Sequence, residues 1–111
     1  MAARERGMSA PPEVVFSTAT DPDRAPAWLP EPLRGDGAGQ PQVEPEGLRA
    51  RWRSGSVPEW SAEIRVEPAD AGGARVRLDL TGGSGEQDTA ALAEETLANL
   101  DREVADNLTA G

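Results

Sequence analysis

The 111-residue chain contains no cysteine, histidine, lysine or tyrosine. Without cysteine it forms no disulfide and offers no thiolate ligand to a metal ion. Without histidine, lysine and tyrosine it also lacks the commonest general bases, the Schiff-base amine and the phenolic acid. Acid–base chemistry would depend on aspartate or glutamate alone. The sequence therefore predicts no catalytic residue, no metal site and no cofactor.

Long apolar runs are also missing, and only 37% of the residues are hydrophobic. No run approaches the roughly 18 apolar residues that a membrane-spanning helix needs. Arg4, Glu5 and Arg6 are not followed by the apolar segment of a secretory signal. We therefore expect a cytoplasmic protein.

Positive charge is scarce. All 11 basic residues are arginines, against 20 acidic residues, and the net charge is −9. Binding to nucleic-acid phosphates or to an anionic membrane requires a positive surface. The sequence therefore predicts neither a nucleic-acid partner nor a membrane partner, and the acidity is interpreted as a solvated surface.

Two parts of the chain lack a clear period. Residues 1–8 (MAARERGM) predict a frayed end or a weak strand. Residues 31–47 are rich in glycine and proline, which predicts a long loop with at best one poor strand around Gln42 to Glu44. A loop of this length is unusual within a compact domain.

Two short helices are predicted between these parts. Ser9-Ala10-Pro11-Pro12-Glu13 starts the first, which ends near Thr20, because proline is tolerated in a first helical turn. Asp21-Pro22-Asp23 starts the second, with Asp21 as N-cap and Pro22 as the first helical residue. The second helix leads to Trp28 and Leu29.

Three segments after the loop alternate strictly between apolar and polar residues, at 48–53, 59–67 and 74–80. A period of two predicts half-buried antiparallel strands. The residues predicted on the apolar face are Leu48, Ala50, Trp52, Trp60, Ala62, Ile64, Val66, Ala74, Val76, Leu78 and Leu80.

The last stretch, Glu86 to Leu108, predicts one long helix with a single apolar stripe. The stripe consists of Ala90, Ala93, Leu97, Leu100, Val104 and Leu108. Ser84 and Gln87 fit a capping box at its start. One apolar helix face and one apolar sheet face bury each other, so residues 1–111 predict a single α+β domain with the helix packed across the sheet.

The order of these elements resembles the helix-grip fold of the START / Bet v 1-like superfamily, specifically the polyketide cyclase-like (SRPBCC) proteins. The residues that carry the resemblance are Ala10 to Phe16 (APPEVVF), Thr20 to Arg24 (TDPDR), Ala27 to Pro30 (AWLP) and Pro58 to Ser61 (PEWS). Family members normally begin with a paired strand and have more strands before the meander, so this chain resembles an abbreviated member.

The resemblance implies a non-catalytic protein that binds a small apolar ligand between the sheet and the long helix. The implied cavity lining is Trp28, Trp52, Trp60, Ile64, Val76, Leu78, Leu97, Leu100 and Val104, with Leu29 at the rim. The alternative for the same residues is an ordinary core, because three tryptophans can fill the space themselves.

Two other functions remain open at this point. The chain could be a cyclase- or aromatase-type enzyme of the same superfamily, although Glu63 and Asp79 are predicted on the outer face of the sheet. It could instead be an interaction module or homodimer that uses the sheet edge and loop 31–47. Arg49, Arg51 and Arg53 form either an anion-binding ladder or, by our interpretation, ion pairs with Glu63, Glu67 or Asp79.

Overall fold

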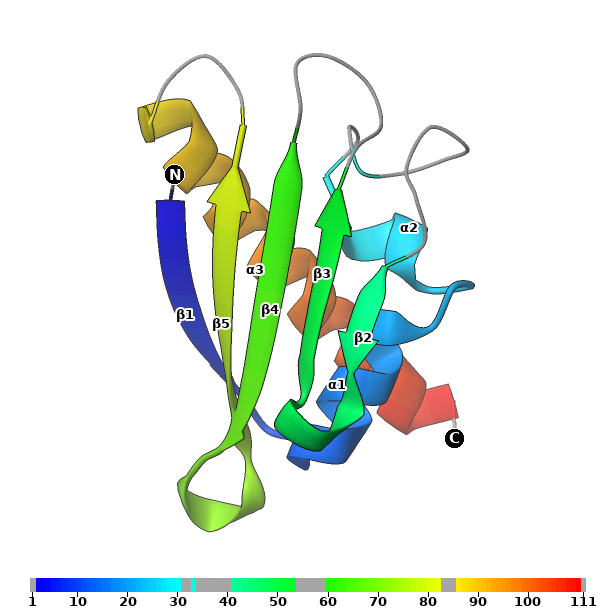
Figure 1. Ribbon diagram of the computed structural model, residues 1–111. Helices are drawn as coiled ribbons and strands as arrows, with labels where there is room; N and C mark the ends of the chain where they lie inside the picture. Colours follow the sequence, from blue (N-terminus) through cyan, green and yellow to red (C-terminus); the bar gives the residue numbers. More distant parts are fainter. Residues whose placement is uncertain (1, 31–32, 34–40, 54–59, 83–85, 111) are drawn as a thin grey trace.

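The computed structural model describes residues 2–30, 33, 41–53, 60–82 and 86–110 (Figure 1). In chain order its elements are β1 (Ala2–Met8), α1 (Pro12–Thr20), α2 (Ala25–Trp28), β2 (Gln42–Glu44), the 3₁₀ turn η2 (Pro45–Gly47), β3 (Arg49–Arg53), β4 (Ser61–Pro68), the 3₁₀ turn η3 (Asp70–Gly72), β5 (Ala74–Thr81) and α3 (Glu86–Ala110).

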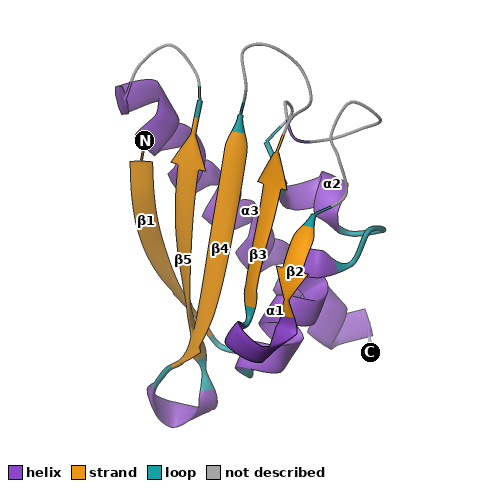
Figure 2. Ribbon diagram, in the orientation of Figure 1, coloured by secondary structure: helices purple, strands orange, loops and turns teal. Residues whose placement is uncertain are grey.

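The strands form one antiparallel sheet in the order β1-β5-β4-β3-β2. All three α-helices lie against the same face of the sheet, and α3 crosses that face diagonally (Figures 1 and 2). No described element covers the other face. The architecture is the predicted α+β helix-grip arrangement, with two short helices before the main strands and one long helix after them.

The apolar alternation of the central strands has its predicted effect. Ile64 pairs with Leu78 and Val66 pairs with Val76 across β4 and β5, and all four side chains are buried. Residues between them, such as Arg65 and Arg77, are exposed on the outer face. Strands β4 and β5 thus have one apolar, buried face and one charged, exposed face, as a period of two requires.

Helix α3 buries the middle of its predicted stripe, and Ala90 near its start is partly buried. Ala93, Leu97, Leu100 and Val104 are at most 2% exposed. The helix extends to Ala110, two residues beyond the predicted end. The side chain of Leu108 and the Ser84 cap lie outside the described residues.

Polar contacts fix α3 along its length. Arg4 and Arg6 of β1 reach Glu94 at 3.3 Å and Asp101 at 2.9 Å. Arg24, in the turn before α2, reaches Glu103 at 3.5 Å. Near the other end, Asn107 Nδ2 donates to Thr18 Oγ1 of α1 at 3.0 Å. Contacts from three separate elements therefore set the angle at which the helix lies on the sheet.

Of the two alternatives predicted for residues 1–8, the strand is confirmed and the frayed end is wrong. Ala2–Met8 is a full strand that pairs with β5 in unbroken register, from Ala2 opposite Leu80 to Met8 opposite Ala74. The helix-facing positions between Ala2 and Met8 are Arg4 and Arg6, which bind carboxylates of α3 instead of burying apolar surface. The usual apolar signal of a strand is therefore absent from its sequence.

The predicted start of the second helix is also wrong. Helix α2 begins at Ala25, and Pro22 lies in the turn that precedes it. Asp21 does cap this turn, because its Oδ1 accepts the Asp23 N–H at 2.9 Å and its carbonyl accepts the Ala25 N–H at 2.8 Å. A proline-containing turn thus replaces the first helical turn.

The strand predicted around Gln42 to Glu44 is confirmed as β2. Residues 45–47 form a 3₁₀ turn where a loop was expected, and most of residues 31–40 lie outside the description. Leu48, which follows the turn, has a φ of 49° and is not part of β3. This left-handed conformation redirects the chain into β3.

We predict that Gly82→Ala destabilises the protein by about 2–4 kcal/mol, because Gly82 combines strain with crowding. Its φ is +134°, and an added Cβ would lie 2.4 Å from Cδ2 of Trp60. The control is Gly72→Ala, where φ is +80° but nothing lies within 4 Å of the added atom. The control should cost only about 1–2 kcal/mol. Urea unfolding followed by tryptophan fluorescence measures both, and equal costs would contradict the prediction.

Candidate functional site

The residues predicted to line a ligand cavity do come together between the sheet and α3. Eight of the nine are buried members of one apolar cluster, and Trp60, just before β4, is partly buried against it. They come from α2 (Trp28), β3 (Trp52), β4 (Ile64), β5 (Val76, Leu78) and α3 (Leu97, Leu100, Val104). Leu29, predicted at the rim, is 3% exposed in the same cluster.

Trp28 and Trp52 close one end of this interior. Their ring centroids are 5.2 Å apart and their planes meet at 87°, the edge-to-face arrangement that aromatic pairs favour. Trp28 is fully buried, and its Nε1 donates to the carbonyl oxygen of Ala19 at 3.2 Å. The indole thus links α2 to the end of α1 and to the sheet, and its one polar group is satisfied.

The interior contains no ionisable side chain among the described residues. Its buried polar side chains there are Thr18, Thr89 and Thr96. Their hydroxyls donate to the carbonyls of Val14, Gly82 and Leu92 at 2.7–2.8 Å. These groups are already satisfied by backbone, so the described part of the interior has neither an acid nor a base to offer a substrate.

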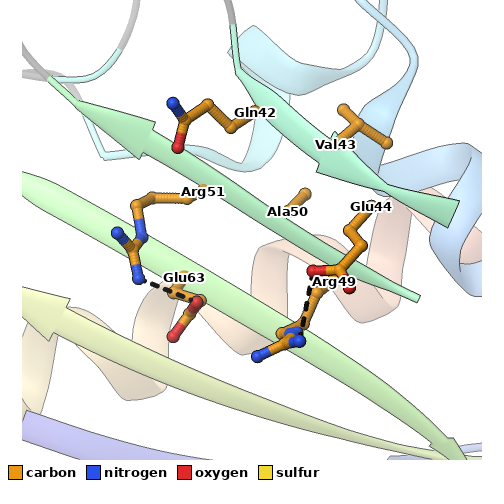
Figure 3. Close-up of a pocket in the computed structure, with 7 residues that line it drawn as sticks. All are labelled: Gln42, Val43, Glu44, Arg49, Ala50, Arg51 and Glu63. Carbon is orange, nitrogen blue, oxygen red and sulfur yellow. Dashed lines mark hydrogen bonds and ion pairs between the residues drawn. The ribbon is translucent and has the colours of Figure 1, made fainter. Parts of the chain in front are cut away.

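Glu63 and Asp79, the only carboxylates considered for catalysis, lie on the outer face of the sheet. Glu63 accepts from Arg51 at 3.1 Å, and Asp79 pairs with Arg77 at 3.5 Å. On the same outer face, a hollow of about 340 Å³ lies over β2, β3 and β4 (Figure 3). It is lined by Gln42, Val43, Glu44, Arg49, Ala50, Arg51 and Glu63. Arg49 there pairs with Glu44 at 3.1 Å. The interpretation of Arg51 as an ion-pair partner of Glu63 is confirmed.

Other hollows lie at the margins of the fold. One continues the outer face past Ser61 and Thr81, one lies between the β1–α1 junction and the β4–β5 turn, and one lies between β1 and α3. Ile64, Val76 and Leu100 border none of these. Their side chains are in contact with protein atoms on all sides, since each is 0% exposed.

The described part of the chain shows neither a group of metal ligands nor a membrane-spanning helix. Within the described ranges, no three His, Cys, Asp or Glu side chains are grouped closely enough to hold a metal ion. No helix of that part of the chain combines the length and the apolarity that a transmembrane span needs.

The chain has a helix-grip fold, the fold that START / Bet v 1-like (SRPBCC) proteins also have. Neither a family model nor a curated protein matches the sequence. The similarity to known proteins is therefore one of fold.

Particular solved structures share this fold. TTHA0849 from Thermus thermophilus superposes with a TM-score of 0.71 at 20% identity, covering 96% of this chain and 97% of that one. Norcoclaurine synthase from Thalictrum flavum, in complex with a transition-state analogue, gives 0.67 at 11% identity, covering 95% and 93%. The di-domain aromatase/cyclase StfQ of steffimycin biosynthesis gives 0.65 at 19% identity, covering 96% of this chain and 44% of StfQ.

Two features of the site could not be found by sequence reasoning. One is the bond from Trp28 to Ala19, which depends on how α2 folds back on α1. The other is the pair of β1 arginines that flank α3, whose partners are 90 or more positions away in the chain. Their only sequence signal is the spacing of Ala2 and Met8, which is compatible with one strand face.

We predict that Trp28→Ala destabilises the protein by about 3–5 kcal/mol, because it leaves a large void beside Trp52. Trp28→Phe should cost less, about 1–3 kcal/mol, since it keeps most of the packing but leaves the Ala19 carbonyl without its donor. Chemical denaturation measures the cost, and near-UV circular dichroism reports loss of the Trp28–Trp52 contact. Val43→Ala at an exposed position is the control. A Trp28→Ala cost no larger than that of the control would contradict the assignment.

Proposed function

We propose that the protein binds a small apolar molecule between the inner face of the sheet and α3, without altering it chemically. The observation that carries this proposal is the composition of the described interior. It consists of aliphatic and indole side chains, with three threonines whose hydroxyls are already bonded to backbone. Such a surface recognises a ligand by shape and apolar contact.

Fold similarity supports the location. The structures that superpose on this chain include one of a norcoclaurine synthase with a transition-state analogue and two of di-domain aromatase/cyclase proteins, StfQ and BexL. The similarity extends over more than nine-tenths of this chain. It indicates the fold, and the ligand class remains part of the proposal.

The same interior favours binding over catalysis. A cyclase needs a group that moves protons at the substrate. Glu63 and Asp79 lie on the opposite face of the sheet, each beside an arginine. We therefore propose a carrier or sensor rather than an enzyme of the aromatase/cyclase type.

Ligand entry requires side chains to move, because Trp28, Ile64 and Leu100 are fully buried in this structure. Trp28 is the best candidate for the moving group. It lies at the end of a four-residue helix, and among the described residues its indole N–H makes a single hydrogen bond, to the carbonyl of Ala19. Movement of α2 would open the interior beside Trp52 while leaving the sheet and α3 in place.

We predict saturable binding of the neutral fluorescent probe 1-aminoanthracene to the purified protein. Leu100→Trp, which fills the interior, should weaken binding at least about ten-fold, equivalent to ~1.4 kcal/mol. Val43→Trp adds the same group at an exposed position and is the matched control. Trp28→Ala should tighten binding, which keeps the test informative if Leu100→Trp does not fold.

The proposal fails if the wild type shows no saturable binding, or if the Leu100 and Val43 variants bind the probe equally well. If the probe binds as predicted, native mass spectrometry of the protein as purified identifies the natural ligand class.

A further inference from the structure

The two edges of the sheet differ in how far they are blocked. β2 has three residues between Pro41 and Pro45, which have no N–H to donate, and is therefore a poor template for another strand. β1 has seven residues and no proline, and it pairs with β5 without a break. Its other side meets no described strand (Figure 1). Half of its backbone N–H and C=O groups therefore point away from the sheet.

A hollow lies between β1 and α3. Its volume is about 210 Å³, and it is lined by Arg4, Glu5, Arg6, Glu94 and Leu97. A strand edge beside a helix is the geometry in which an added peptide strand can place one row of side chains against the helix. Gly7, further along β1, has nothing within 4 Å of an added Cβ, so the strand is also open there.

The two arginines of this hollow retain hydrogen-bonding capacity. A guanidinium has five N–H donors. Arg6 donates through Nε to Asp101, and Arg4 donates through Nε to Glu94 and through Nη1 to the Ala3 carbonyl. These hydrogen bonds leave both terminal nitrogens of Arg6 and one terminal nitrogen of Arg4 able to donate to another acceptor. The side chains of Arg4 and Arg6 are 41% and 44% exposed, so an external carboxylate can reach them.

A second copy of the chain fits this edge poorly. Two copies related by a two-fold axis would pair their β1 strands antiparallel, with residues of the same face opposite each other. Centring the axis on Glu5 places Arg4 opposite the other copy's Arg6, and centring it on either arginine places that arginine opposite itself. Centring it on Ala3 or Gly7 avoids such pairs but joins only three residues of each seven-residue strand. Like charges directly opposite each other destabilise a strand pair. The sequence Arg4-Glu5-Arg6 is instead complementary to an acid–base–acid strand.

We propose that the open edge of β1 is a strand-addition site for an extended peptide segment of a partner protein, with acidic side chains opposite Arg4 and Arg6 and a basic or neutral one opposite Glu5. The peptide backbone pairs with β1. Its acidic side chains accept from the terminal guanidinium nitrogens in the hollow beside α3. This site shares only Leu97 with the interior proposed for an apolar ligand, and strand addition does not require that interior to open, so either can exist without the other.

The test uses two fluorescein-labelled peptides of equal length that exchange glutamate and lysine at their three central positions, TVEKEVT and TVKEKVT. Each is titrated with the full chain and followed by fluorescence anisotropy. TVEKEVT should bind at least about ten-fold more tightly, since three opposite-charge pairs, with Arg4, Glu5 and Arg6, replace three like-charge pairs. Arg4→Gln/Arg6→Gln should reduce that difference to less than about three-fold. Arg102→Gln, at an exposed position of α3, is the control and should leave the difference intact.

A second measurement tests strand pairing itself. In a ladder, the N–H groups of only every other peptide residue face the neighbouring strand. N-methylation of one alternate set in TVEKEVT should abolish binding, and N-methylation of the other set should not. This arm holds even if the double arginine variant fails to fold. Equal affinity for both peptides, indifference to the N-methylation pattern, or a dimer whose formation protects the β1 amides from hydrogen exchange would overturn the proposal.

Discussion

The structure depends on the burial of one apolar stripe of α3 against the inner face of the sheet. Neither surface is stable in water alone, and each leucine or valine buried there contributes about 1.5–3 kcal/mol. Four residues of the stripe, Ala93, Leu97, Leu100 and Val104, are almost fully buried, and they meet strands whose inner residues are equally buried. The short helices α1 and α2 complete the layer that α3 begins (Figure 1).

Polarity is divided between the two faces of the sheet in the central strands β3, β4 and β5. The inner face is apolar and closed at one end by Trp28 and Trp52. The outer face carries rows of arginine and carboxylate, such as Arg51 with Glu63 and Arg77 with Asp79. Over these central strands the apolar side chains therefore face the helices, and the charged side chains, Glu63 and Asp79 among them, are on the other face.

Most of the fold could be predicted from the sequence, because most elements have one wet and one dry face. The alternation around Ile64 and Val76 and the stripe of Leu97 and Leu100 each have the period of a single element type. The pairing of Arg51 with Glu63 was predictable for the same reason, since both residues fall on the outer face of neighbouring strands.

The failures of sequence reasoning have a common cause, which is that distant partners change what a residue does. Arg4 and Arg6 lie on the helix-facing side of β1 because Glu94 and Asp101 receive them. A local pattern contains no sign of that. Likewise, Pro22 is compatible with a helix start, but it lies in a turn before α2, and this turn places Trp28 within hydrogen-bond distance of the Ala19 carbonyl. The candidate interior could be named from the sequence, whereas its tight closure by Trp28 depends on tertiary structure.

Native-state hydrogen exchange is the most direct test of the central claim that α3 and the sheet stabilise each other as one unit. Amides near Leu100 in α3 and near Leu78 in β5 should open with the same free energy, and both values should equal the free energy of global unfolding. If α3 exchanges through an opening of clearly lower free energy than β5, the helix is an accessory to a sheet that is stable without it. That result would contradict the account.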